Sequence, residues 1–86
     1  MILKLFTKPD CPKCPAAKEL VKQLRVACYE LKIEEYDIST VEGLAEASFY
    51  SVMSTPSIIL CDGRGKEKRG WRGEVPPAKE VLKKIQ

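Results

Sequence analysis

The stretch Lys-Pro-Asp-Cys-Pro-Lys-Cys at residues 8–14 places two cysteines three positions apart, between an apolar run and an amphipathic segment. Upstream, residues 2–6 are apolar apart from Lys4, which predicts a strand buried on most of its surface. Downstream, apolar residues recur at intervals of three and four, which predicts an amphipathic helix; they are Ala17, Leu20, Val21, Leu24, Ala27, Cys28 and Leu31. The cysteine pair therefore lies where a strand leads into a helix, and this context is typical of a redox dithiol.

The two thiols of this pair differ in their expected chemistry. Unpaired N–H groups and the positive end of the helix dipole favour the thiolate form of Cys11, with Lys8 and Lys13 as further sources of positive charge. An ordinary thiol with a pKa of about 8.5 is only about 3% ionised at pH 7, so this stabilisation matters for reactivity. Cys14, one turn further into the helix, is expected to be more shielded and to act second. We predict Cys11 as the nucleophile and Cys14 as the resolving thiol.

The middle of the chain is expected to add a strand and a helix. Residues 32–38 alternate imperfectly between apolar and polar and predict a second strand. Residues 39–42, Ser-Thr-Val-Glu, match the capping box and predict that a helix starts at Ser39 and ends near Ser51. Its apolar stripe would be Val41, Leu44, Ala45 and Phe49.

The last third of the chain predicts a hairpin and a closing helix. The apolar residues 57–61 and the turn at residues 62–65 predict a strand that returns over residues 66–71. The returning strand is heavily charged, which suits the edge of a sheet. Pro76 and Pro77 open a final helix, whose apolar side would be Ala78, Val81, Leu82 and Ile85.

Length and composition limit the possible function classes. The chain has 86 residues, 44% of them hydrophobic and 31% charged, which predicts one folded domain over residues 1–86. No run approaches the ~18 apolar residues of a membrane span, and a net charge of +3 is too mild to indicate nucleic-acid binding. Histidine is absent, which removes Cys-His nucleophile pairs and mixed Cys/His zinc sites. We expect a monomeric cytoplasmic protein.

Three other interpretations of these features are weaker. The cysteine pair would be half of a zinc site only with a second close pair, whereas Cys28 and Cys61 stand far apart, so no metal is expected. A stabilising disulfide is disfavoured because so short a loop constrains the unfolded chain least. Cys28 and Cys61 lie in apolar patterns and are expected in the core. The basic run over residues 64–72 fits a solvated sheet edge better than a nucleic-acid surface.

Residues 8–14, followed by Ser-Thr-Pro-Ser-Ile-Ile at residues 54–59, resemble the glutaredoxin and small-thioredoxin family along the whole chain. The resemblance implies the α/β thioredoxin fold, a four-stranded mixed sheet flanked by three helices. It also implies a cis peptide bond at Thr55-Pro56 and thiol-disulfide exchange as the activity. In the family the cis-proline loop lies opposite the dithiol and offers the backbone of the residue before proline to a substrate, which implies contacts at Pro12, Thr55 and Pro56. Lys8 and Lys13 are added as candidate substrate-binding residues because of their charge beside the dithiol.

Departures from the family pattern point to the subtype. The Cys-Pro-Lys-Cys site resembles glutaredoxin, but the Gly-Gly-Asp pattern that holds glutathione carboxylates is missing, and Glu74 near that place would repel a carboxylate. We therefore expect a protein disulfide oxidoreductase without a cofactor, reduced by a thioredoxin-reductase-type donor. The alternatives are a glutathione-dependent glutaredoxin and, from another class, a metal or iron-sulfur carrier without redox turnover.

Overall fold

The computed structural model describes residues 1–85, which form four strands and three helices. In chain order these are β1 (Ile2–Thr7), α1 (Cys14–Ala27), β2 (Lys32–Asp37), α2 (Val41–Phe49), β3 (Ser57–Cys61), β4 (Glu67–Arg72) and α3 (Ala78–Ile85). The predicted order of elements is confirmed. Within the described residues, no helix is long and apolar enough to cross a membrane.

The strands form one mixed sheet in the order β2-β1-β3-β4. β1 runs parallel to β2 and antiparallel to β3, and β3 runs antiparallel to β4. Phe6 near the end of β1 lies in register with Tyr36 of β2 and with Ser57 at the start of β3. The fold expected from the resemblance, a four-stranded mixed sheet with three helices, is confirmed.

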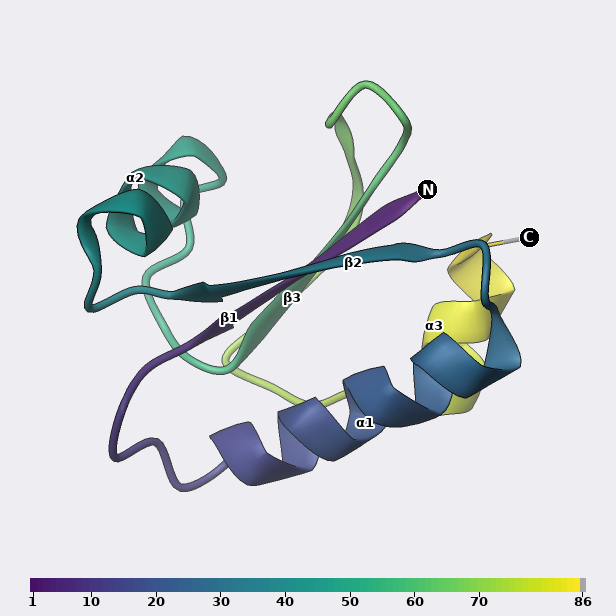
Figure 1. Cartoon of the computed structure of the whole chain (residues 1–86), viewed down its shortest axis with the longest axis horizontal. Coiled ribbons are helices and arrows are strands. Elements are labelled where there is room, and N and C mark those ends of the chain that lie inside the picture. Colours follow the sequence, from purple (N-terminus) through teal and green to yellow (C-terminus); the bar gives the residue numbers. More distant parts are fainter. Residues whose placement is uncertain (86) are drawn as a thin grey trace.

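The helices cover the sheet from both sides, with α1 and α3 on one face and α2 on the other (Figure 1). Alternate residues of β1 serve the two sides because successive side chains of a strand point to opposite faces. Leu3 and Leu5 pack with the apolar side of α1 and with Val81 of α3. Phe6 packs on the other face against Ala47 of α2.

Helix α2 turns its apolar stripe away from the sheet, which corrects the simplest interpretation of its sequence. Val41 is 84% exposed, Leu44 56% and Phe49 76%, while the residues of α2 that face the sheet are Gly43 and Ala47. A Cβ atom at Gly43 would collide with the main-chain carbonyl oxygen of Asp37. The helix therefore packs through its smallest residues because the close approach leaves no room for larger ones.

The N-terminal cap of α2 lies one residue later than the capping box predicts. The Thr40 Oγ1 accepts a hydrogen bond from the Gly43 N–H at 3.0 Å and donates to the Asp37 carbonyl at 2.7 Å. Ser39 is instead held by the Asp37 carboxylate, which accepts from the Ser39 N–H at 2.8 Å and from its hydroxyl at 2.6 Å. Both Ser39 and Thr40 have a hydroxyl that could cap the helix, and the conformation of the turn after β2 places the Thr40 hydroxyl at the capping position.

Three other boundaries differ slightly from the sequence prediction. Helix α1 ends at Ala27, so Leu31 is buried in the turn before β2 and not on the helix. Strand β2 ends at Asp37. Strand β4 runs over Glu67–Arg72 at the sheet edge, one residue later than predicted, with a register shift at Leu60/Cys61 of β3.

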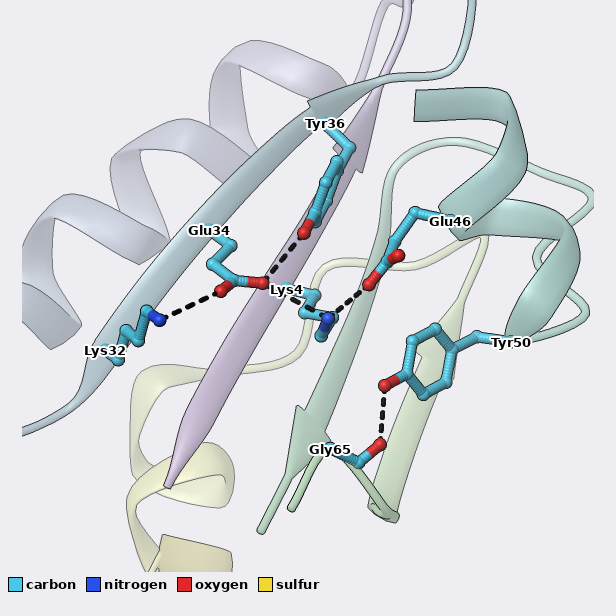
Figure 2. A network of polar contacts seen from close by, with 7 residues as sticks. All are labelled: Lys4, Lys32, Glu34, Tyr36, Glu46, Tyr50 and Gly65. Atoms are coloured by element: carbon cyan, nitrogen blue, oxygen red, sulfur yellow. Dashed lines mark hydrogen bonds and ion pairs between the residues drawn. The ribbon is translucent and has the colours of Figure 1, made fainter. Parts of the chain in front are cut away.

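A lysine lies nearly buried between the sheet and α2 (Figure 2). Lys4 of β1 forms ion pairs with Glu34 of β2, at 3.1 Å, and with Glu46 of α2. Its ammonium also lies over the rings of Tyr36, 5.5 Å away, and Tyr50, 5.1 Å away. Burial works against this charge, but the two carboxylates outweigh it and raise the pKa of Lys4. The polar break in the β1 sequence is thus the anchor that holds α2 to two strands.

Candidate active site

The two cysteines of residues 8–14 are joined by a disulfide at the start of α1. Their Cα atoms are 5.3 Å apart, and helix α1 begins at Cys14 with Lys13 as its cap residue. The Cys14 N–H donates to the Cys11 carbonyl at 3.2 Å, so Cys11 sits in a turn just before the helix. Cys11 is 8% exposed and Cys14 is 4% exposed. The dithiol therefore lies at the positive end of the helix dipole, as the sequence predicts.

The loop from β1 to α1 is shaped by its backbone. Asp10 has a φ of 61°, the left-handed conformation that aspartate tolerates better than most residues. Pro15 occupies the first turn of α1, where the missing N–H would have no helical partner in any case. These local preferences place Cys11 between the turn at Asp10 and the helix start.

The dithiol opens onto a hollow of 620 Å³, which we call the dithiol hollow. Small-molecule sites commonly have volumes of about 300 to 1,000 Å³. The dithiol hollow is lined by Lys8, Pro9, Asp10, Cys11, Pro12, Cys14, Pro15 and Lys18. Lys8 and Pro12 are thus both next to the disulfide-bonded cysteines. Lys13 is exposed and is not among the lining residues.

Lys18 is a lining residue that the sequence analysis missed. It lies four residues after Cys14, one helical turn further along the same side of α1, and this spacing was the available signal. Together with Lys8 it gives the dithiol hollow two positive charges against the one carboxylate of Asp10. The hollow therefore favours negatively charged groups near the disulfide.

The loop that enters β3 contains the cis peptide bond Thr55-Pro56 expected from the resemblance. The Pro56 carbonyl accepts from the Gly73 N–H at 2.9 Å, and the Ser57 hydroxyl donates to the Ser54 carbonyl at 2.7 Å. Because the end of β1 pairs with the start of β3, this loop and the β1–α1 loop lie at the same end of the sheet (Figure 1). Two chain segments more than forty residues apart in sequence are brought to one end of the molecule.

Thr55 and Pro56 differ in how far they are exposed at the surface. The Thr55 Oγ1 is enclosed by protein and has no hydrogen-bond partner within residues 1–85, although the residue as a whole is half-buried. Pro56 is fully buried. In this oxidised form Pro56 offers no accessible ring, so its contribution lies in the shape of the loop that carries Thr55.

A second hollow of 490 Å³, which we call the apolar hollow, lies beside the cis-proline loop. It is lined by Ile38, Leu44, Ala47, Ser48, Ser51, Val52 and Met53. Met53, two residues before Thr55, is 94% exposed. The sequence analysis did not find this surface, because it depends on the outward orientation of α2.

The other two cysteines lie apart from the dithiol hollow. Cys61 is fully buried at the far end of β3, where it pairs with Ile2, and burial raises the pKa of its thiol. Cys28 caps α1 and is only half-buried, less than the sequence analysis expected. Within residues 1–85, no three histidine, cysteine or carboxylate side chains gather in a way that could hold a metal ion.

Comparisons with known proteins agree with this geometry. Residues 3–65 match the family model for glutaredoxin. The chain is 36% identical over 58 residues to a thioredoxin of Methanocaldococcus jannaschii, covering 67% of each chain. It is 34% identical over 62 residues to a probable thioredoxin of Archaeoglobus fulgidus, covering 72% of this chain and 67% of that protein.

The fold likeness extends over nearly the whole chain. Thioredoxin O2 of Arabidopsis thaliana in its oxidised state superposes with a TM-score of 0.83 at 19% identity, covering 98% of this chain and 73% of that one. The family match, the two relatives and the disulfide at the start of α1 support the same conclusion. The chain belongs to the glutaredoxin family and is a thiol-disulfide oxidoreductase with a thioredoxin-like redox function.

Proposed function

We propose that the chain reduces disulfides of proteins, with Cys11 as the attacking thiol and Cys14 as the resolving thiol. The Cys11 thiolate attacks one sulfur of the substrate disulfide, forms a mixed disulfide and releases the other substrate sulfur as a thiolate. The Cys14 thiolate then attacks the Cys11 sulfur, which releases the second substrate thiol and forms the Cys11–Cys14 bond seen in the structure. The observation that carries this order is the position of Cys11 before the helix and of Cys14 within it, where Cys14 is the less exposed.

We propose substrate contacts for the candidate residues of the sequence analysis. Lys8 and Pro12 border the dithiol hollow, and the backbone of the half-buried Thr55 precedes the cis bond at the same end of the sheet. Pro56 would act by holding the loop, and Lys13 would act only through its charge at the rim, since it is exposed outside the hollow. The contributions of Lys8 and Thr55 are thus direct, and those of Pro56 and Lys13 are indirect.

Trapping of the mixed disulfide tests the division of labour between the two cysteines. In Cys14→Ser the resolving nucleophile is gone, so a covalent adduct with a disulfide-containing protein such as insulin should accumulate and be visible by mass spectrometry without reductant. Cys11→Ser should form no adduct. Equal trapping by the two variants would contradict the assignment.

We propose further that a thioredoxin-reductase-type enzyme, rather than glutathione, returns electrons to the bridge. The positive charges of Lys8 and Lys18 suit one glutathione carboxylate, but the apolar hollow beside the loop suits a protein surface. The chain lacks the Gly-Gly-Asp pattern that holds glutathione carboxylates in glutaredoxins. The loss of one such hydrogen-bonded contact costs roughly 1.5 to 3 kcal/mol, which lowers the affinity for glutathione about ten- to a hundredfold. Reduction of disulfides also implies a reducing compartment, so we propose a cytoplasmic location. We propose separately that the protein is a monomer.

Stopped-flow reduction of the oxidised protein by each donor distinguishes the two cases. We expect the reductase with its nucleotide cofactor to reduce the bridge much faster than millimolar glutathione does. Faster reduction by glutathione would identify the chain as a glutathione-dependent glutaredoxin and would contradict the proposed donor.

A further inference from the structure

A third hollow, which we call the basic hollow, lies on the α2 side of β4 and has a volume of 550 Å³. One wall is the C-terminal end of α2 with the residues that follow, 49–51. The other wall is the β3–β4 turn and β4, contributed by residues 64–67 and Arg72. No residue of the dithiol hollow lines it.

The charge of the basic hollow is unbalanced. It contains Arg64, Lys66 and Arg72 against the single carboxylate of Glu67. Arg72 already holds Glu67 with two hydrogen bonds, of 3.0 and 2.8 Å, and donates a third of 2.7 Å to the Tyr50 carbonyl. Neither Arg64 nor Lys66 forms an ion pair within the part of the chain that the structure describes. These two cations are therefore available to an anionic partner.

The turn that carries the two cations is held in place before any partner arrives. The Asp62 carboxylate accepts from the Arg64 N–H at 2.8 Å and from the Lys66 N–H at 3.0 Å. The Gly65 carbonyl accepts from the Tyr50 hydroxyl at 2.5 Å, which ties the turn to the end of α2 (Figure 2). A fixed frame lowers the entropy lost when a partner binds.

An aromatic ring lies beside this charge. Phe49 is 76% exposed, and its ring is held edge-on against the Tyr50 ring with the centroids 4.9 Å apart. An exposed aromatic residue next to free cations matches a partner that carries both carboxylates and an apolar side chain. The hollow is a largely open depression of the surface, which suits an extended peptide better than a nucleotide, since small ligands are usually mostly enclosed.

The basic hollow also adjoins the proposed site of exchange. Ser51 lines both this hollow and the apolar hollow, and Arg72 pairs with Ser57 directly after the cis-proline loop. A protein lying over that loop can therefore reach both hollows at once.

We propose that the basic hollow docks an acidic segment, with an aromatic or aliphatic side chain among its carboxylates, of the protein partner that exchanges disulfides with this chain. This inference rests on the proposed function for the identity of the partner. The docking contact itself involves neither cysteine.

The test measures binding of a dye-labelled peptide of alternating glutamate and phenylalanine to the oxidised full chain by fluorescence anisotropy. We expect saturable binding that weakens as salt is added, because exposed charges are screened. Arg64→Glu combined with Lys66→Glu should weaken it by about tenfold or more. Phe49→Ser should weaken it severalfold, and a peptide with lysine in place of glutamate should not bind.

The matched control is Lys83→Glu combined with Lys84→Glu, which changes the net charge equally on α3, at the opposite face of the sheet. This variant should bind the acidic peptide like the unaltered chain. Equal weakening by the two double variants, or no saturable binding, would overturn the inference. Binding of ATP that depends on Arg64 and Lys66, without binding of the peptide, would overturn it in favour of a nucleotide site.

A separate measurement keeps this inference distinct from the proposed function. Exchange with hydroxyethyl disulfide, a small uncharged substrate, should be unchanged in the Arg64→Glu, Lys66→Glu variant. If the unaltered chain failed to exchange but still bound the acidic peptide, the proposed function would be contradicted while the docking site remained supported. If the Arg64→Glu, Lys66→Glu variant lost exchange with hydroxyethyl disulfide while the unaltered chain retained it, the basic hollow would do more than dock a partner and the inference would be contradicted.

Discussion

Thr55 carries a hydroxyl that the protein encloses without giving it a hydrogen-bond partner in residues 1–85. Such a group loses its contact with water and gains nothing in return, which costs about 1 to 3 kcal/mol. It stands next to Pro56 at the end of the sheet where the dithiol lies. The cost is therefore located at the end of the sheet where exchange is proposed to take place.

Substitution of this threonine by valine should reveal that cost. We expect Thr55→Val to raise the free energy of unfolding of the oxidised protein by up to about 1 kcal/mol, because valine has the same shape without the unpaired hydroxyl. Urea denaturation followed by circular dichroism measures the change.

Thr40→Val is the matched control for this prediction. The same chemical change there removes the Thr40 cap of α2 and should lower the stability by about 1 kcal/mol. If Thr55→Val destabilised the protein as much as Thr40→Val, the Thr55 hydroxyl would have a partner in solution.

At the scale of the element, α2 shows how close packing and charge combine. Gly43 and Ala47 bring the helix near the sheet, and the ion pair between Lys4 and Glu46 holds it there. On the sheet side, Glu34 accepts a hydrogen bond of 2.8 Å from the Tyr36 hydroxyl. Burial, and to a lesser extent this hydrogen bond, raise the pKa of Tyr36 to about 12. The docking of α2 is therefore both steric and electrostatic.

The steric part predicts that Gly43→Ala destabilises the protein although alanine is the better helix former. Helix propensity favours alanine by about 1 kcal/mol, but the added Cβ meets the Asp37 main chain, which cannot move aside like a flexible side chain. We expect a net loss of about 1 to 3 kcal/mol in thermal or urea unfolding. Gly63→Ala, where the Cβ would meet no atom within 4 Å, should change the stability by less than about 0.5 kcal/mol. A stabilising Gly43→Ala would show that α2 does not pack as closely as described.

The electrostatic part predicts a dependence of stability on pH. The hydrogen bond from Tyr36, together with the Lys4 ammonium, holds the pKa of Glu34 below its ordinary value of 4.5. A carboxyl whose pKa is lowered by folding stabilises the protein above its unfolded pKa, and this stability is lost as the pH falls through the folded pKa. The free energy of unfolding should therefore decline from about pH 4.5 downward.

Glu34→Gln should flatten this decline and lower the stability at neutral pH by about 1 kcal/mol. The control is Glu35→Gln, on the next residue of β2, whose carboxylate is half-exposed and contacts Arg25 of α1 at 3.7 Å. Denaturant titrations over a series of acidic pH values provide the measurement. An unchanged acid decline in Glu34→Gln would contradict the assignment to this group.

At the scale of the whole molecule, four of the seven large apolar residues that are exposed within residues 1–85 gather around α2. Val41, Leu44, Phe49 and Met53 are all exposed on α2 or between it and the cis-proline loop. An apolar surface of this kind, adjoining a redox site, is typical of a region that contacts other proteins. The end of the molecule that carries the dithiol is therefore also the end best suited to a protein substrate.

Met53→Ser tests this surface. Partial burial of a methionine side chain against a protein substrate is worth about 1 kcal/mol, so reduction of insulin should slow about fivefold. Exchange with hydroxyethyl disulfide, which is too small to reach Met53, should not change.

The matched control is Val26→Ser, which removes another highly exposed apolar residue, 84% exposed, from the far end of α1. It should leave both rates unchanged. Equal slowing of insulin reduction in the two variants would show that the effect does not belong to this surface.

The amino-acid sequence alone was sufficient for the order of the elements and for the location of the dithiol. Both depend on residues close together in the chain: the spacing of Cys11 and Cys14, the three- and four-residue apolar repeat after them, and the turn residues before β4. The resemblance to a known family supplied the sheet arrangement and the cis bond at Thr55-Pro56, and the structure confirms both.

Features that depend on contacts between distant segments could not be found in the same way. A periodic pattern shows which residues of α2 share a side, but the packing of Ala47 against Phe6 of β1 determines which side faces the sheet. In the sequence, Lys4 only interrupts an apolar strand. Its role as an ion-pair partner depends on Glu34 of β2 and Glu46 of α2, which the fold brings next to it. Local propensity acts between near neighbours, whereas the packing of α2 and the surfaces beside it arise only when segments forty residues apart come into contact.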